Sequence, residues 1–487
     1  MIAWALLWPP FPLRGNVCSY SKEFQALPRF EWTQIPEELR PEKGEVRFGY
    51  LLVPENRNHP EDSKIIKLAV ALLKSTSENP RKDPVLFTTG GPGVLSTVRA
   101  ANYFHKVPFI TEIMKDRDFI LFEQRGAKYS IPNLLGPEID EVFLSSIGTH
   151  VNGEPDKKGL LQAAQNLKSR LEKTGIDLTA YNSTESAADI EDLRKVWHIS
   201  HWNLVGISYS CRLILEVLRH YPAGVRAVVL DSPLPPDANW NEMSVENYWS
   251  AMSRLFARCR ENDEINAKYP NLEERFLALL QEARRQPREV SASHPSTKKA
   301  VRIKVDDRGI FQALAAYIGQ TRKLEEFASV VHNLCQGNTF AMNYLIDPLI
   351  SPKDFSWGMA YSFWINEELP FEDFRKFNEH KNVPDQLRNM EFTAIPKEIY
   401  DIWPKRHSGP SENQPVHSQV PALILGGELD PDTPPAFARM VAQHLPNSHL
   451  LIFKDRSHLQ IFSNPCGKII VREFLNHPGA RPEGGCL

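Results

Sequence analysis

The chain places a serine between a short apolar segment and a helix-forming segment, and this junction constrains the fold more than any other feature. Residues 202–205 read Trp-Asn-Leu-Val, residues 206–210 read Gly-Ile-Ser-Tyr-Ser, and residues 211–218 are largely apolar with helical spacing. A glycine two residues before a serine permits the tight turn that lifts a hydroxyl above the edge of a sheet. We therefore predict a strand, a sharp turn carrying Ser208 and a helix.

The turn departs from the usual Gly-x-Ser-x-Gly pattern, because Ser210 stands where the second glycine is expected. A small side chain at this position can still allow the helix to pack closely against the strand. Gly-x-Ser also occurs at residues 409–411, but that copy lies in a polar, proline-containing stretch that follows no predicted strand. We therefore keep Ser208 as the candidate nucleophile.

Short apolar segments alternate with helical patterns on both sides of this turn. Their apolar character predicts β-strands at residues 46–53, 67–73, 84–89, 118–122, 202–205, 227–231, 422–426 and 449–453. The spacing of apolar residues predicts helices at 183–197, 211–218, 435–444 and 467–476. Buried strands that alternate with helices indicate an α/β fold, with a mostly parallel central sheet covered by helices on both faces.

One long stretch interrupts this alternation. Residues 237–413 are rich in charged and aromatic side chains, show helical patterns and contain no convincing buried strand. We therefore expect a large helical cap inserted between the two parts of an α/β core. The expected core comprises residues 41–236 and 414–487, and residues 1–40 form a poorly defined N-terminal extension.

The overall composition is that of a globular protein. The 487 residues include 42% hydrophobic and 24% charged side chains, with a formal net charge of −3. Because no basic stripe is present, nucleic acid and anionic membranes are poor candidates for partners. No apolar run reaches the roughly 20 residues that a membrane span requires. The oligomeric state is left open.

The N-terminus and the cysteines leave the cellular compartment open. Residues 1–10 are hydrophobic but short, lack a preceding basic residue and end in prolines, so they make a poor signal peptide. The six cysteines are widely spaced and form no CxxC pattern, and we predict neither a metal nor a cofactor. Cys466 and Cys486 flank a predicted helix and could pair, with reduced thiols as the alternative.

Two further residues complete a candidate triad with Ser208. Asp430 and His458 each follow a predicted strand, so both are expected at the carboxyl edge of the sheet, where Ser208 also lies. A serine hydroxyl becomes nucleophilic when a histidine accepts its proton and a carboxylate orients that histidine. Asp231, at another strand end, is a rival for the orienting carboxylate. Asp430 and Asp432 could instead cap the next predicted helix.

A glycine-rich turn supplies the remaining part of the candidate site. Residues 90–93 read Gly-Gly-Pro-Gly directly after a predicted strand. The backbone N–H groups of Gly91 and Tyr209 are the candidates for an oxyanion hole, since Tyr209 opens the helix after Ser208. A tight turn without a ligand is the alternative. A phosphate site is disfavoured, because the chain has neither a Walker lysine nor a GxGxxG pattern.

Together these motifs resemble the α/β-hydrolases of the prolyl aminopeptidase and tripeptidyl aminopeptidase type, including their C-terminal TAP-like segment. The matching motifs follow the family's order through most of the chain, at residues 49–57, 90–93, 123–126, 206–209, 430–435 and 458. The resemblance implies an α/β-hydrolase fold and an acyl-enzyme mechanism. It assigns Ser208 as the nucleophile, His458 as the general base and acid, and Asp430 as its orienting carboxylate. Gly91 and Tyr209 become the oxyanion donors.

The resemblance further implies that acidic residues of the cap bind the free α-amine of a peptide substrate. Glu367 and Glu368 are the candidates, and Trp364 beside them is a candidate subsite residue. A buried ammonium group requires a carboxylate partner, which gives this assignment its physical basis. A solvated helix face is the alternative for the two glutamates.

The function expected from the resemblance is a serine aminopeptidase that acts on a peptide and releases N-terminal residues or short peptides. The alternatives are an esterase, amidase or other acyl hydrolase acting on a small acyl substrate with the same triad, and a non-catalytic binding protein on this scaffold. Exported relatives carry cysteines near positions that other residues occupy here, namely Phe48, Gly136, Ile265 and Ile365. Cys466 and Cys486 do match a family pair. An exported, periplasmic protein and a cytoplasmic one therefore both remain open.

Overall fold

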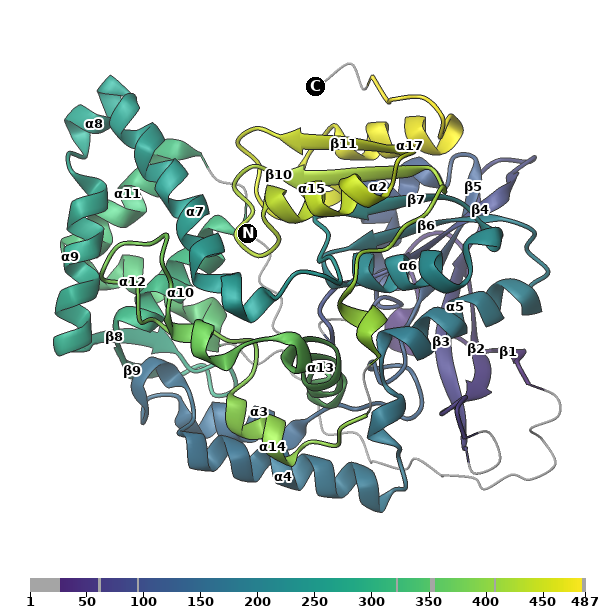
Figure 1. The fold of residues 1–487 in the computed structure, drawn as a ribbon, viewed down its shortest axis with the longest axis horizontal. Coiled ribbons are helices and arrows are strands. Elements are labelled where there is room, and N and C mark those ends of the chain that lie inside the picture. The colour runs from purple at the N-terminus through teal and green to yellow at the C-terminus, as the bar shows by residue number, and fades with distance from the viewer. Residues whose placement is uncertain are drawn as a thin grey trace.

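A nine-stranded sheet forms the centre of the protein in a computed structural model, which describes residues 27–59, 63–93, 96–320, 323–350, 355–406 and 409–483 (Figure 1). Its strands lie side by side in the order β1-β2-β3-β5-β4-β6-β7-β10-β11. They are β1 (Arg29–Thr33), β2 (Val46–Pro54), β3 (Ile65–Leu73), β4 (Arg81–Thr88), β5 (Arg117–Phe122), β6 (Trp202–Ile207), β7 (Val225–Asp231), β10 (Ala422–Gly427) and β11 (Ser448–Phe453).

The directions of the strands define the fold. From β5 to β11 all neighbouring strands are parallel. β3 runs antiparallel to both β2 and β5, and β1 adds an antiparallel edge strand from within the segment expected to be an extension. A mostly parallel sheet with a strand–turn–helix junction at β6 is the α/β-hydrolase arrangement. The predicted fold class is confirmed.

Alternate residues of the parallel strands face opposite layers of helices. In β4, Val85 and Phe87 pack on one side of the sheet and Leu86 packs on the other. The first side is covered by α1 (Ala100–Tyr103), α2 (Pro108–Ile113), α16 (Gln460–Ser463) and α17 (Gly467–Asn476). The second side is covered by α5 (Ser183–Val196), α6 (Tyr209–His220) and α15 (Pro435–His444). Because both faces are buried, the strands are almost wholly apolar.

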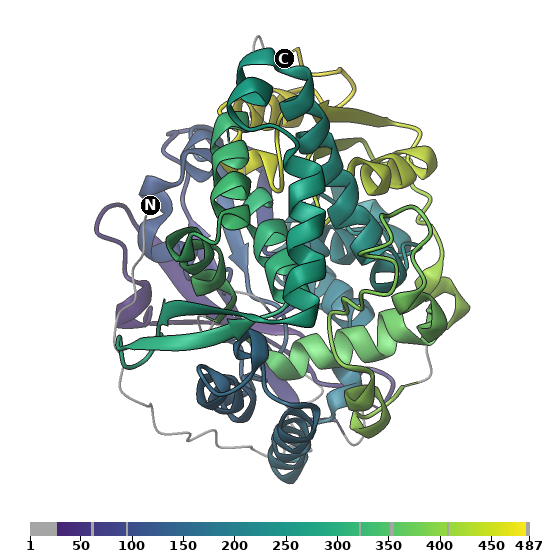
Figure 2. The same cartoon turned by 90° about the vertical axis from the view of Figure 1, so that its left-hand side faces the viewer.

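A largely helical cap follows β7 and lies at one end of the sheet (Figure 1). Viewed from the cap side, its helices lie in front of the sheet (Figure 2). They are α7 (Trp240–Glu261), α8 (Asp263–Lys268), α9 (Leu272–Arg285), α10 (Asp307–Ile318), α11 (Leu324–Cys335), α12 (Thr339–Ile350), α13 (Trp357–Phe363), the π-helical turn η7 (Trp364–Glu368) and α14 (Lys397–Ile402). The cap has a hydrophobic core of its own, in which the rings of Phe276 and Phe327 pack against Phe256.

The cap also contains a β-hairpin that the sequence prediction missed. β8 (Arg288–Ser293) and β9 (Ala300–Val305) pair in antiparallel fashion. Alternate residues of each strand are buried, among them Val290 and Ile303, and their neighbours are exposed. The expectation of a helical cap without a convincing buried strand therefore missed this hairpin, which is buried on one face only. A strand with one buried face alternates apolar and polar residues and lacks the continuous apolar run of a central strand.

A second segment outside the sheet joins the cap. α3 (Pro137–Ser146) and α4 (Lys157–Lys173) lie between β5 and α5, and their apolar residues share one buried cluster with α13 and α14 (Figure 1). Trp357 Nε1 of α13 donates a hydrogen bond to Asp140 Oδ1 of α3 at 2.8 Å. The first part of the expected core therefore also contributes helices that pack with the cap.

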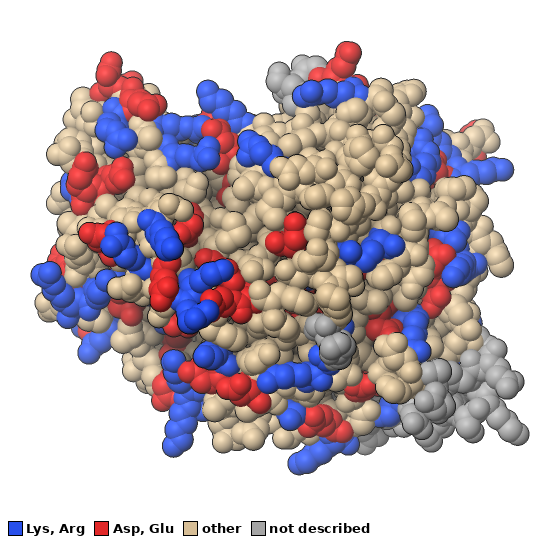
Figure 3. Space-filling view, in the orientation of Figure 1, with Lys and Arg blue, Asp and Glu red and all other residues tan. Residues whose placement is uncertain are grey.

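Charged side chains of both signs are mixed on the face shown in Figure 3, where Lys and Arg lie beside Asp and Glu. No helix in the described ranges is long and apolar enough to cross a membrane. Cys466 is disulfide-bonded, whereas Cys486, its suggested partner, lies outside the described residues. Cys211, Cys259 and Cys335 are free thiols.

Candidate active site

Ser208 stands on a sharp turn between β6 and α6. Its backbone has φ 55° and ψ −125°, a conformation that residues with a side chain rarely adopt. The turn is held because the Ser208 N–H donates to the Asp231 carbonyl at 2.9 Å. Ile207 and Tyr209 are buried, whereas Ser208 is partly exposed. The strand, turn and helix predicted around Ser208 are therefore present.

Ser210 takes part in this turn through its side chain. Its Oγ accepts a hydrogen bond from the Ile207 N–H at 2.8 Å and lies 2.8 Å from the Thr88 carbonyl, to which it donates. Gly206 leaves no room for a side chain, because a Cβ there would lie 2.7 Å from Ile214 Cδ1. The turn thus requires glycine at position 206, while the serine at position 210 links β4 to β6.

The glycine-rich turn after β4 lies directly against Ser208. A Cβ on Gly90 would lie 2.8 Å from Ser208 Cβ and 3.4 Å from its Oγ, so glycine permits this close approach. Gly91 has φ 135°, in the region that favours glycine. Tyr209 is the first residue of α6, and the first N–H groups of a helix have no partner within it. The two candidate oxyanion donors therefore belong to segments that meet at Ser208.

Glu123 and Gln124 support the glycine-rich turn. Buried Glu123 accepts hydrogen bonds from Ser96 Oγ at 2.9 Å and from the Val98 N–H at 3.1 Å. Gln124 Nε2 donates to the Thr89 carbonyl at 2.9 Å. Burial raises the pKa of Glu123 to about 7. These contacts fix the segments on either side of the turn.

Asp430 and His458 form a hydrogen-bonded pair in the loops that follow β10 and β11. His458 Nδ1 lies 2.8 Å from Asp430 Oδ2. The second oxygen, Asp430 Oδ1, accepts hydrogen bonds from the N–H groups of Asp432 at 3.0 Å and Thr433 at 2.9 Å. Asp430 is 1% exposed, so water screens its charge very little. The structure thus brings these two predicted residues together and fixes the carboxylate.

The neighbouring carboxylates control the titration of His458. Burial acts to lower the pKa of the imidazole, but Asp430, followed by Asp432 and Asp231, outweighs burial and raises the pKa to about 9. These carboxylates therefore stabilise an imidazolium ion at this position. Among the described residues, Ser208 Oγ makes no hydrogen bond to His458, so the third link of a triad is not formed in this conformation.

Asp231, the alternative candidate for orienting the His458 imidazole, accepts hydrogen bonds from backbone N–H groups. Its carboxylate accepts the N–H groups of Gln460 at 2.9 Å and Ile461 at 2.8 Å, just beyond His458. Its carbonyl accepts the Ser208 N–H, as described above. Asp231 therefore joins the loop that carries His458 to the turn that carries Ser208. The orienting hydrogen bond of the imidazole comes from the loop after β10.

The chemistry of the Asp430, Asp432 and His458 side chains would also suit a metal ion. Their ligand atoms all lie within 4.8 Å of one another. These atoms have hydrogen-bond partners of their own, since Asp430 Oδ2 bonds to His458 and Asp432 Oδ1 accepts the Tyr248 hydroxyl at 2.7 Å. The three side chains are therefore held in place by hydrogen bonds within the protein.

Glu367 and Glu368 lie buried in η7, but Arg212 of α6 compensates their charge. Arg212 forms an ion pair with Glu368, and its Nε lies 3.7 Å from Glu367 Oε2. Glu367 Oε1 also accepts the Ser183 N–H at 2.7 Å. The two glutamates are only 3% and 1% exposed, so they do not form a solvated helix face. Burial raises the pKa of Glu368 to about 8.

Trp364 belongs to an aromatic group that reaches the loop after β10. Its ring centroid lies 5.5 Å from that of Trp240, and Trp240 Nε1 donates to the Asp432 carbonyl at 2.9 Å. Tyr248, on the same helix as Trp240, also contacts Asp432. The sequence interpretation missed Trp240 and Tyr248, because a helical pattern does not reveal which distant loop its apolar face meets.

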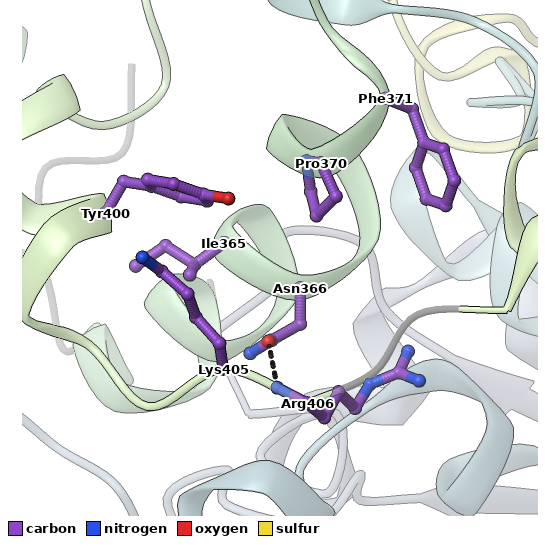
Figure 4. A pocket seen from close by; sticks show the side chains of 7 residues that line it. All are labelled: Ile365, Asn366, Pro370, Phe371, Tyr400, Lys405 and Arg406. Atoms are coloured by element: carbon purple, nitrogen blue, oxygen red, sulfur yellow. Dashed lines mark hydrogen bonds between the residues drawn. The ribbon is translucent and has the colours of Figure 1, made fainter.

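A cavity of about 280 Å³ lies beside η7 (Figure 4). Its lining residues are Ile365, Asn366, Pro370, Phe371, Tyr400, Lys405 and Arg406. Lys405 Nζ lies 4.0 Å from the centroid of the Tyr400 ring. Ser208 and His458 do not line this cavity, so it is separate from the candidate reaction centre.

Comparisons with known proteins agree with this architecture. The family model described as TAP-like protein matches residues 397–486, which include Asp430 and His458. Tripeptidyl aminopeptidase of Streptomyces lividans is 22% identical over 441 residues, which cover 86% of this chain and 80% of the relative. Serine protease Hip1 of Mycobacterium tuberculosis is 22% identical over 235 residues, covering 45% and 42%.

A solved proline iminopeptidase from Mycobacterium smegmatis is 14% identical and aligns over 88% of this chain and 98% of its own, with a TM-score of 0.40. This chain has an α/β-hydrolase fold and a C-terminal segment that matches the TAP-like family model, and it is similar in sequence to tripeptidyl aminopeptidases.

Proposed function

We propose that the protein is a serine hydrolase in which Ser208 is the nucleophile, His458 the base and Asp430 its orienting carboxylate. The observation that carries the proposal is the 2.8 Å hydrogen bond between His458 Nδ1 and buried Asp430. This bond occurs on loops joined through Asp231 to the strained turn of Ser208. A bond at Nδ1 leaves Nε2 free to exchange protons with the substrate and the serine.

The proposed reaction follows from these roles. Ser208 Oγ bonds to the substrate carbonyl carbon while its proton passes to His458 Nε2. The N–H groups of Gly91 and Tyr209 stabilise the negative charge that develops on the carbonyl oxygen. His458 then protonates the leaving group, and a water molecule that His458 deprotonates releases the acyl group from Ser208. Ser208 Oγ has to reorient toward His458 when substrate binds, as is common where no ligand is present.

We propose a peptide as the substrate, cleaved near its N-terminus. Support comes from the similarity to tripeptidyl aminopeptidases over 86% of the chain. The TAP-like segment also contains Asp430 and His458. A cap beside the candidate site would restrict which substrates reach Ser208, as an exopeptidase requires.

The pairing of Arg212 with the two cap glutamates favours a second candidate, an acyl hydrolase for esters or amides without a free amine. A substrate ammonium group needs carboxylate charge that no other cation has compensated. Arg212 lies next to both Glu367 and Glu368. The aminopeptidase candidate therefore depends on a single carboxylate oxygen for binding the substrate amine. This atom is Glu368 Oε2, which is buried without a hydrogen-bond partner among the described residues.

Matched substrates separate these two candidates. We expect aminoacyl or tripeptidyl anilides with a free amine to react faster than the same anilides with a blocked amine and faster than short acyl esters. Glu368→Gln should reduce the preference for the free amine. Glu372→Gln is the matched control, because buried Glu372 is bound to Asn241. Equal rates on free and blocked anilides would contradict an aminopeptidase, and faster ester hydrolysis would favour the second candidate.

Replacing the nucleophile tests the hydrolase itself. Ser208→Ala should lower kcat by about a thousandfold or more, because the covalent step is lost. Its circular dichroism and melting temperature should match those of the wild type. Near-normal turnover by Ser208→Ala would contradict the assignment of Ser208.

A further inference from the structure

One helix of the cap reaches the proposed acid–base pair through a series of hydrogen bonds. α7 begins at Trp240, whose Nε1 donates to the Asp432 carbonyl at 2.9 Å. About two turns later, the Tyr248 hydroxyl donates to Asp432 Oδ1 at 2.7 Å. The Asp432 N–H in turn donates to Asp430 Oδ1 at 3.0 Å, and Asp430 Oδ2 bonds to His458 at 2.8 Å. The cap helix is therefore connected to the imidazole.

Farther along α7, an arginine joins the two loops to each other. Arg258 forms ion pairs with Glu428, at 2.6 Å, and with Asp455. Glu428 precedes Asp430 in the first loop, and Asp455 precedes His458 in the second. The same helix thus contacts both loops close to the strand ends from which they emerge (Figure 1).

The surroundings of His458 give the Asp432 carboxylate a specific role. The groups that face the imidazole are Asp430, Asp432 and Thr433 after β10, and Asp231 at the end of β7. From the cap, Tyr248 bonds to Asp432, and the Gly319 carbonyl accepts the backbone N–H of His458 at 3.3 Å. Asp432 is one of the carboxylates that raise the pKa of His458. The position of its charge therefore affects the strength of the base.

We propose that Tyr248 is a positioning residue that acts through Asp432, so that the docked cap holds the Asp430–His458 pair ready to accept a proton. The inference rests on the proposed function, because it takes His458 as the base. Tyr248 is 6% exposed, and its ring packs against Phe392 with centroids 4.8 Å apart, which fixes the direction of the hydroxyl. Separation of the cap from the sheet would remove this donor from Asp432. His458 is then held in position to act as the base only while the cap is docked against the sheet.

A fluorophosphonate that reacts with activated serines tests this inference without the natural substrate. Ser208 Oγ forms a bond to phosphorus, the P–F bond breaks, fluoride leaves and the Ser208 proton passes to His458. The dependence of the labelling rate on pH reports the titration of that base. Wild-type protein that is not labelled, or Ser208→Ala that is labelled equally, would overturn the proposed function as well as this inference.

The role of Tyr248 is tested in two backgrounds. Tyr248→Phe removes the hydroxyl and keeps the ring, and we expect the labelling rate to fall about tenfold through loss of a hydrogen bond to a charged group. In an Asp432→Asn background the same change should alter the rate less than about twofold, because Tyr248 acts through that carboxylate. Asp432→Asn alone should move the acid limb of the labelling profile to lower pH, since one charge that raises the pKa of His458 is gone.

Tyr361→Phe is the matched control. It removes the same atom from a buried cap tyrosine that packs against Trp357 and Trp403, away from both loops. We expect Tyr361→Phe to be labelled at the wild-type rate. If the wild type is labelled but Tyr248→Phe slows labelling equally in both backgrounds, or lowers only the melting temperature, the contact is merely structural and the positioning role is overturned.

Discussion

Ser208 and Ser210 occupy the same turn and contribute to it differently. Ser208 adopts a backbone conformation with φ 55°, which leaves it partly exposed between buried neighbours. The Ser210 hydroxyl is fully buried and bonds to the Ile207 N–H and the Thr88 carbonyl. A small polar side chain is accepted in place of the usual glycine because its hydrogen bonds are satisfied. The departure from the sequence pattern therefore leaves the turn intact.

The raised pKa of His458 predicts how the stability of the folded protein changes with pH. Folding raises this pKa from 6.5 to about 9, so the pair stabilises the folded state fully below pH 6.5 and loses this contribution as the pH rises toward 9. The wild type should therefore exceed His458→Gln in free energy of unfolding by on the order of 3 kcal/mol near pH 6, just below the unfolded pKa of the imidazole. The excess should shrink toward pH 9. Urea titrations in which the excess grows with pH would contradict this account.

The ends of the parallel strands explain how much of the candidate site could be predicted. Ser208, Asp430 and His458 each follow a β-strand that can be recognised in the sequence as an apolar run. Parallel strands bring their carboxyl ends to the same edge of the sheet, so these residues could be expected to lie close together. Tyr248 and Arg212 could not be found in this way, because each matters through a partner far along the chain. The β8–β9 hairpin was missed because its apolar residues alternate with polar ones.

The close approach of β10 to the loop after β11 can be tested with two adjacent glycines. A Cβ on Gly427 would lie 2.0 Å from the Ser457 carbonyl oxygen, next to His458, whereas a Cβ on Gly426 meets the flexible end of Ile452 at 3.1 Å. We expect Gly427→Ala to displace the His458 loop and lower kcat/KM at least about tenfold, since small misplacements are costly in catalysis. Gly426→Ala should retain most activity. Equal effects of the two substitutions on kcat/KM would contradict this geometry.

At the scale of the whole molecule, the cap contacts three parts of the candidate site. The Ser356 N–H donates to the Gly93 carbonyl at 2.8 Å, in the glycine-rich turn. Glu368 pairs with Arg212 on the helix that follows the Ser208 turn, and Tyr248 contacts the loop after β10. The cap therefore supports the candidate site at several points. Its sequence predicted a largely helical insertion with candidate binding residues Glu367, Glu368 and Trp364, but not these contacts with the core.

The ion pair between cap and core predicts a large effect on stability. Arg212→Met would leave Glu367 and Glu368 buried without their arginine, which should lower the free energy of unfolding by about 3–5 kcal/mol. Adding Glu368→Gln should restore part of the loss. Arg219→Met, on the same helix, is the control, because its buried partner Glu216 keeps a second cationic partner in His220, whose Nε2 lies 3.3 Å from Glu216 Oε2. Equal losses for Arg212→Met and Arg219→Met in urea denaturation would contradict this role of the pair.

The central claim is that Ser208 carries the acyl group during turnover. Mass spectrometry of protein quenched during hydrolysis of a tripeptidyl anilide tests this claim most directly. The account predicts an added acyl mass on the peptide that contains Ser208, and none in Ser208→Ala. Hydrolysis at the full rate with no adduct, or an adduct on another residue that survives in Ser208→Ala, would contradict it.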